Sequence, residues 1–218
     1  MNNAARLVSI AKPLLASIAS RSGRVLYSAA STLKPGAIYL LGLNPGGDPA
    51  THHETVDQSL SDLPERRLNA YLDESWAGQP VGCSRLQRRV SWLMEHLGFE
   101  VRDVCASNLI FLRSSDSSGS GYPQIAKLCW PVHERILRIV QPKAILVFGN
   151  SRVSPFRFLQ ARYAGATLAS FPSGHGVWQC YGFTMPSDIR VIGLPHLSRY
   201  AVNNHPEVAD WVRWYGAL

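Results

Sequence analysis

The chain is poor in several features that would each have assigned it to a class. Only four of its 218 residues are cysteine, and none forms a C-x-x-C pair, which leaves zinc knuckles and iron–sulfur clusters without support. No run approaches the roughly 18 to 20 consecutive apolar residues that span a bilayer. Neither a G-x-S-x-G elbow nor a G-x-x-x-x-G-K-[ST] phosphate loop is present. We therefore expect a soluble globular protein of a reducing compartment, with no metal, no cofactor and no membrane partner.

Acidic residues are scarce at the amino terminus, where the first is Asp48, whereas residues 1–34 carry five basic residues. Acid-poor, Arg-bearing amino termini occur in organelle transit peptides. The same segment also carries apolar residues at helical spacing that could pack on the domain: Leu7, Ile10, Leu14 and Ile18. We interpret residues 1–34 as a basic helical extension of a single domain covering residues 1–218. The expected location is the cytoplasm of a bacterium, near the nucleoid, or a nucleus.

Positive charge dominates the whole chain, with a formal net charge of +7 and a sequence pI near 9.5. Only four of the 22 basic residues are lysine. Guanidinium groups fork onto phosphate better than ammonium groups do, so this composition favours a polyanion such as nucleic acid. Many soluble proteins are basic, and charge therefore supports the motifs without standing alone.

Alternating strand-like and helix-like segments predict an α/β protein with a mainly parallel sheet. Four apolar runs are candidate buried strands: 37–43, 104–111, 144–148 and 191–194. The segment 166–185 is expected to be an extended pair around a Gly-rich turn. Ser84 with Gln87 three residues later predicts a capped helix that ends at Gly98. Pro206 could open the last helix.

A polar residue follows each of the four apolar runs: Asn44, Asn108, Asn150 and His196. Because the carboxyl ends of parallel strands meet at one edge of a sheet, these residues are expected to lie together. Any one of them could be an ordinary turn residue. The presence of four favours a binding or catalytic site.

Four motifs between residues 37 and 200 resemble those of the uracil-DNA glycosylase superfamily. They are Gly42-Leu43-Asn44-Pro45-Gly46, Ser107-Asn108-Leu109, Pro142-Lys143-Ala144-Ile145-Leu146-Val147-Phe148-Gly149, and Pro195-His196-Leu197-Ser198-Arg199. The G-x-N-P-G form is similar to the mismatch-specific, thymine-DNA and single-strand-selective branches. The last motif departs from the His-Pro-Ser-Pro of many relatives. The resemblance implies a three-layer α/β/α sandwich with a central, mainly parallel four-stranded sheet.

The resemblance also implies a DNA glycosylase, which flips a nucleotide out of the helix and hydrolyses the bond between sugar and base. Asn44 would hold the attacking water, His196 would donate a hydrogen bond to the pyrimidine O2, and Asn108 would read the edge of the base. The expected substrate-binding backbone comprises Gly42, Leu43, Pro45, Gly46 and Gly47. No lysine lies in these loops, so we expect no Schiff base and a monofunctional enzyme that leaves an abasic site.

The residues after His196 lie in the loop that relatives push into the duplex. Arg199 could fill the space left by the flipped nucleotide, or Tyr200 could stack there instead. Ser198 could contact phosphate. The alternative for all three is an ordinary solvated loop.

Three more residues have two interpretations each. Asp48 could act as a general base for the water, but we favour its capping a helix after the Gly-Gly turn. His53 lies beside His52 and Glu54, a set that resembles metal ligands but is better interpreted as pocket rim or exposed loop. His175, in its Gly-flanked loop, could reach DNA or lie on the surface.

The choice of base depends on Gly46, which stands where the uracil-specific branch has a bulky Tyr. The missing ring leaves room beside the pyrimidine C5, so uracil, thymine, hydroxymethyluracil and larger modified pyrimidines are all expected to fit. Base-excision repair and defence against modified phage DNA both remain open. The expected partner is single- or double-stranded DNA and the expected state a monomer. The alternative function is a catalytically silent nucleic-acid-binding module on the same fold.

Overall fold

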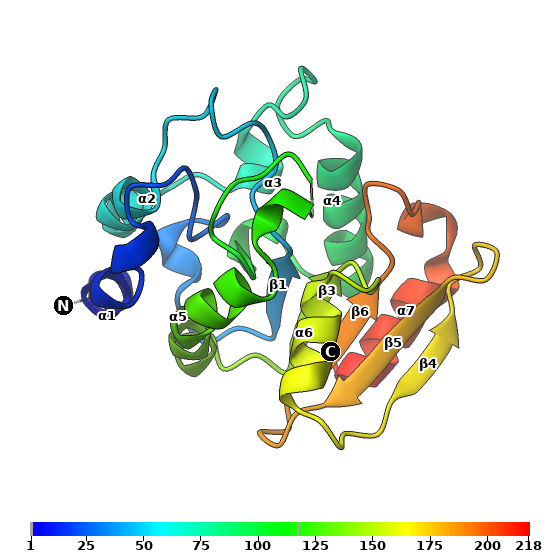
Figure 1. Cartoon of the computed structure of the whole chain (residues 1–218). Helices are drawn as coiled ribbons and strands as arrows, with labels where there is room; N and C mark the ends of the chain where they lie inside the picture. Colours follow the sequence, from blue (N-terminus) through cyan, green and yellow to red (C-terminus); the bar gives the residue numbers. More distant parts are fainter. Residues whose placement is uncertain (1, 117) are drawn as a thin grey trace.

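The computed structural model describes residues 2–116 and 118–218, which form an α/β fold around a mixed sheet (Figure 1). The sheet has six strands in the order β2-β1-β3-β6-β5-β4. They are β1 (Ile38–Gly42), β2 (Cys105–Asn108), β3 (Ala144–Phe148), β4 (Ala169–Pro172), β5 (Gln179–Thr184) and β6 (Arg190–Leu194). β2, β1, β3 and β6 run parallel to one another, whereas β5 and β4 are antiparallel to their neighbours.

The prediction of a four-stranded sheet is wrong, because the expected extended pair joins the sheet as β4 and β5 and makes it six-stranded. The four apolar runs do form its parallel part. β5 pairs with β6 through Tyr181 opposite Gly193, and the β4–β5 hairpin thereby satisfies the backbone groups of an otherwise open edge. β2 is also shorter than expected and ends at Asn108, after which the chain turns across the end of β1.

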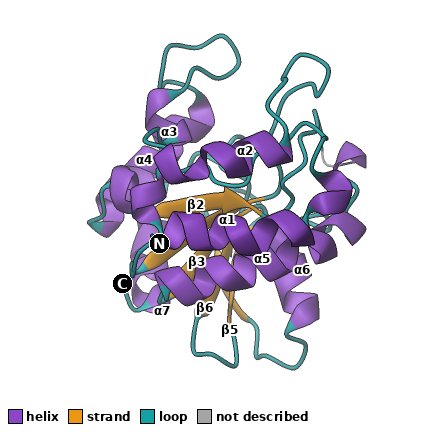
Figure 2. Cartoon of the chain, turned by 90° about the vertical axis from the view of Figure 1, so that its left-hand side faces the viewer, coloured by secondary structure: helices purple, strands orange, loops and turns teal. Residues whose placement is uncertain are grey.

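Helices pack on both faces of the sheet and give the molecule three layers (Figure 2). The described residues contain seven α-helices: α1 (Asn3–Leu14), α2 (Val56–Asp62), α3 (Ala70–Asp73), α4 (Arg85–Leu97), α5 (Gln124–Val140), α6 (Pro155–Arg162) and α7 (Pro206–Gly216). α1, α2, α5 and α6 share one apolar core with the sheet, and α3, α4 and α7 share the other. None of these described helices is long and apolar enough to cross a membrane.

Local signals in the sequence set the helix boundaries. The capping box of α4 is confirmed, with Ser84 N–H donating to Gln87 Oε1 at 3.0 Å and Gln87 N–H donating to Ser84 Oγ at 3.3 Å. Gly98 ends the helix in the left-handed region with φ of 84°. Pro206 is the first residue of α7, as predicted. These signals fix where α4 begins and ends before β2, and where α7 begins after β6.

The amino-terminal segment contributes directly to the core. α1 lies beside α5 (Figure 2) and buries Leu7 and Ala11, and Leu15 follows them into the same cluster. The chain then runs along the edge strand β2, where Tyr27 N–H donates to the carbonyl of Ala106 at 2.8 Å. This segment covers the free edge of β2 and holds the Tyr27 side chain near the end of that strand.

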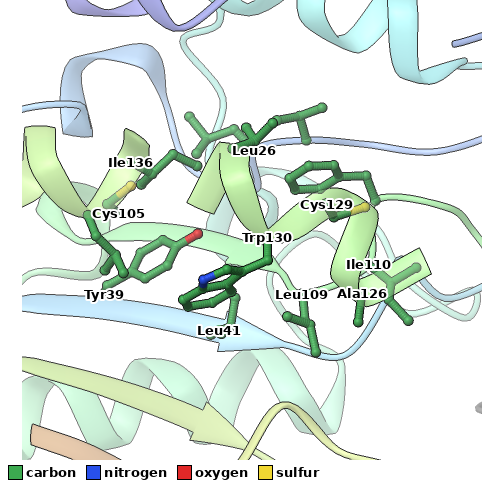
Figure 3. Packing of buried hydrophobic residues seen from close by; sticks show 14 of the residues in the cluster. Leu26, Tyr39, Leu41, Cys105, Leu109, Ile110, Ala126, Cys129, Trp130 and Ile136 are labelled. Carbon is green, nitrogen blue, oxygen red and sulfur yellow. The ribbon is translucent and has the colours of Figure 1, made fainter. Parts of the chain in front are cut away.

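Tyr39 lies in the apolar cluster around Trp130 (Figure 3), and its hydroxyl makes a buried polar contact there. The Tyr39 hydroxyl lies 2.8 Å from His133 Nδ1, and His133 Nε2 lies 3.1 Å from the carbonyl of Leu109. Burial lowers the pKa of His133 to about 4, although hydrogen bonds to the Leu109 and Asn108 backbone oppose the shift. The neutral imidazole therefore ties α5 to the backbone directly after Asn108.

Candidate functional site

The parallel strands bring the predicted polar residues to one edge of the sheet. Asn108 is the last residue of β2, whereas Asn44 follows β1, Asn150 follows β3 and His196 follows β6. Because β1 and β6 are separated by β3, the strands that lead to Asn44 and His196 are two strand spacings apart, about 10 Å.

Asn44 has its side-chain amide fixed by three acceptors. Its Nδ2 donates to the carbonyl of Pro45 at 2.8 Å, to the carbonyl of Ser114 at 3.1 Å and to Ser114 Oγ at 2.9 Å. No described residue donates a hydrogen bond to its oxygen Oδ1. The amide is thus oriented with its nitrogen against the protein and its oxygen available as an acceptor.

Asn108 has the opposite polarity, because its nitrogen is the end without a partner. The residue is only 5% exposed, and its Nδ2 has no hydrogen-bond partner among the described residues. Its Oδ1 lies over Gly42, where a Cβ atom would come within 2.1 Å of it. Gly42 is therefore needed so that the Asn108 side chain can lie across the end of β1.

His196 is exposed at the end of β6 and has a defined tautomer. Ser198 N–H donates to His196 Nδ1 at 3.2 Å, and Ser198 Oγ lies 2.7 Å from the same nitrogen. A backbone N–H can only donate, so Nδ1 is the acceptor and the proton of the neutral ring is on Nε2. Although His196 is exposed at the surface, the protein around the ring removes part of its hydration, and this desolvation together with the charge of Arg199 lowers the pKa of His196. The side chain is a neutral donor at Nε2.

Asn150 lies at the same edge but has a structural contact pattern. Its Nδ2 donates to the carbonyl of Gln179 at 2.6 Å and to that of Gly193 at 3.1 Å. One amide therefore holds the loop after β3 to β5 and β6, next to His196.

The glycine loop after β1 has one open and one crowded position. Gly46 is exposed, and a Cβ atom there would meet nothing within 4 Å. Gly47 has φ of +102° and packs against the His52 ring, so a side chain there would be strained. Pro45 is buried and Leu43 half-buried. The space beside Gly46 is the feature that the base-selection argument requires.

The loop after His196 corrects one prediction. Tyr200 is fully buried, and its hydroxyl donates to the carbonyl of Ser173 at 2.6 Å, so it cannot stack in a DNA duplex. Arg199 is exposed, as an inserted side chain requires. Ser198 is occupied by its contact with His196. The buried Tyr200 ring packs on His205 and anchors the loop that carries these residues.

Asp48, His53 and His175 all lie on exposed loops. The helix-cap interpretation of Asp48 is wrong: its Oδ1 accepts from Ala50 N–H at 2.9 Å in a turn, and Thr55 caps the next helix. His175 lies in the β4–β5 turn, with its ring centre 6.4 Å from that of Tyr200. No group of three or more potential metal ligands occurs in the part of the chain that the structure describes.

A basic group at the start of α4 was not predicted from the sequence. Arg85 and Arg88 are exposed there, and Arg89 donates to the carbonyl of Leu197 at 2.6 Å. Burial and the charges of its two arginine neighbours lower the pKa of Arg89. Cations are unfavourable at a helix N-terminus, and the first turn has no acid to offset them. Three arginines directly after a helix-capping box, where acids are favoured, were the signal in the sequence that could have indicated this basic group.

Two surface hollows lie away from this edge. One of about 380 Å³ lies between α1 and α5, and one of about 360 Å³ lies at the end of α5 near Met185. Neither is lined by a residue of the strand-end loops, so neither bears on the chemistry at these loops. No protein-family model matches the chain, and no curated protein matches its sequence.

Proposed function

We propose that the protein is a monofunctional DNA glycosylase that hydrolyses the N-glycosidic bond of a flipped uracil or C5-modified pyrimidine and leaves an abasic site. The observation that carries this proposal is that the hydrogen bonds of Asn44 and His196 fix opposite roles for their free atoms. One offers a fixed acceptor and the other a fixed neutral donor, on strands about 10 Å apart.

The acceptor and the donor each match one requirement of the reaction. Asn44 Oδ1 can accept a hydrogen bond from the attacking water, with Ser114 holding the amide in place. His196 Nε2 can donate to the pyrimidine O2 as the bond between C1′ and N1 breaks and its electron pair stays on the base. A donor aimed at developing charge contributes about 3 to 4 kcal/mol to lowering the barrier. Asn108 Nδ2 can donate to another acceptor of the base.

The surface beside His196 suits the phosphates of DNA. Arg199 is exposed in the loop, and Arg85 and Arg88 are exposed on α4, which is tied to that loop through Arg89. The guanidinium groups around the site would hold the strand on either side of the flipped nucleotide. The same chemistry serves repair and defence against modified DNA, and the substrate range decides between them.

Base release from end-labelled DNA tests the proposal. Single- and double-stranded oligonucleotides would carry uracil, thymine or hydroxymethyluracil, and abasic sites would be read by alkaline cleavage. We expect release by the wild type and at least a 100-fold loss in Asn44→Ala. Asn3→Ala is the matched control, because that amide donates to Leu33 at the opposite edge of the sheet. Tight DNA binding without release of any base would instead support the silent binding module.

The preference for bases is tested at Gly46. A Tyr there meets no local obstacle, since a Cβ atom has nothing within 4 Å and the backbone is not left-handed. We expect Gly46→Tyr to retain uracil release and to lose thymine and hydroxymethyluracil. An unchanged ratio of rates for these bases would contradict the argument from space.

A further inference from the structure

Two buried side-chain nitrogens lack hydrogen-bond partners among the described residues, and both lie at the proposed site. They are Asn108 Nδ2 and Arg113 Nε. The two residues are 5% and 9% exposed. A buried donor without an acceptor costs about 1 to 3 kcal/mol, and more when it is charged. Two such donors at one sheet edge indicate a ligand that brings acceptors.

Arg113 is also a buried cation without a counter-charge. Its Nη1 donates to the carbonyl of Gly46, and no described carboxylate forms an ion pair with it. Two half-buried acids, Glu54 and Glu74, are already paired with Arg24, each at 2.7 Å. An uncompensated guanidinium in such a place is unfavourable unless an acceptor of negative charge arrives.

Both residues contact the end of β1 and the loop that follows it: Asn108 Oδ1 lies over Gly42, and Arg113 Nη1 donates to the carbonyl of Gly46. Burial raises the pKa of Tyr27, and the charges of Arg24 and Arg113 and the amide of Asn108 oppose the rise. Ser114, the next residue, is the one that fixes Asn44. Arg113 thus stands between the Asn108 end of the site and the loop that carries Asn44 and Gly46.

We infer that Arg113 is a substrate-binding residue of this site, which acts with Asn108 to hold the acceptor edge of the extruded pyrimidine. The inference rests on the function proposed above. In the reaction the bond between C1′ and N1 breaks, its electron pair stays on the base, and a water oxygen bonds to C1′ and releases a proton. The Arg113 guanidinium stabilises the negative charge that develops on the leaving base, by donating a hydrogen bond on the side of the base away from His196.

The test compares two leaving bases under single-turnover conditions. Fluorine stabilises the departing anion, so release of 5-fluorouracil needs the guanidinium less than release of uracil does. We expect Arg113→Met to slow uracil release by about 100-fold and 5-fluorouracil release by clearly less. Arg113→Lys, which keeps the charge, should recover part of the uracil rate. Arg138→Met, on the exposed last turn of α5, is the matched control and should match the wild type.

The outcomes separate the two proposals. An equal loss for both bases would mean that Arg113 only braces the Gly46 carbonyl, and an unchanged uracil rate would remove it from the site; either result overturns the inference and leaves the glycosylase intact. A wild type that releases neither base overturns the proposed function and this inference with it. Thermal unfolding of each variant verifies that the compared proteins are folded.

Discussion

The single methyl group added by Gly42→Ala should lower the rate of base release strongly and the stability of the fold little. Gly42 lies at the end of β1 directly opposite Asn108 of β2. Its backbone is not in the left-handed region, so Gly42→Ala introduces no backbone strain. The added methyl group would meet the Asn108 side chain, which is the group proposed to read the base.

The size of the effect follows from the contact. A Cβ atom at position 42 would lie 2.1 Å from Asn108 Oδ1, whereas real Cβ atoms essentially never come closer than 3.0 Å. The amide must therefore retreat by at least about 0.9 Å. A shift of about 1 Å in a positioning group costs on the order of 100-fold in rate. The obstacle is the end of a side chain and not backbone, so the free energy of unfolding should change much less.

Single-turnover uracil release and thermal unfolding should be measured on the same preparations. Gly36→Ala is the matched control, because a Cβ atom there would meet nothing closer than 3.8 Å. In the double variant with Asn108→Ala, the loss should equal that of Asn108→Ala alone, since both changes act through one side chain. Full activity of Gly42→Ala, or additive losses in the double variant, would refute this reasoning.

Two further predictions concern stability and DNA binding. The pKa of His133 is about 4 in the fold and near 6.5 in the unfolded chain, so folding favours the neutral ring. That contribution, about 3 kcal/mol, should be complete above pH 6.5 and fall as the pH drops toward 4; urea unfolding across this range measures it, and the corresponding slope should disappear in His133→Gln. Arg88→Ala should reduce the dependence of DNA affinity on salt by about one counterion, whereas Arg138→Ala should not; equal slopes would place the phosphates elsewhere.

The parallel part of the sheet could be predicted because its strands are continuous apolar runs that end in Gly, Asn or Pro. The β4–β5 hairpin could not be assigned to the same sheet. Its strands are short and alternately exposed, and only pairing with β6 shows where they belong. Periodicity reports burial along one segment and carries little information about which edge that segment joins.

The polar residues at the strand ends were predictable for the same reason, but their orientations were not. Tyr200 and Arg199 are adjacent in a loop, and only packing decides that one is buried and the other exposed. Arg113 gives no signal in the sequence, because its significance depends on Glu54 and Glu74 being bound by Arg24. Such facts belong to contacts between distant segments.

The bond between Arg89 and the Leu197 carbonyl couples two properties that could otherwise have changed independently. Helix α4, whose exposed arginines would bind the DNA, therefore also positions the loop that carries His196. A substitution in α4 that increases DNA affinity would also move His196, and a substitution in the loop that speeds base release would also weaken DNA binding by α4. DNA affinity and the rate of base release would then be expected to change together among variants of this chain.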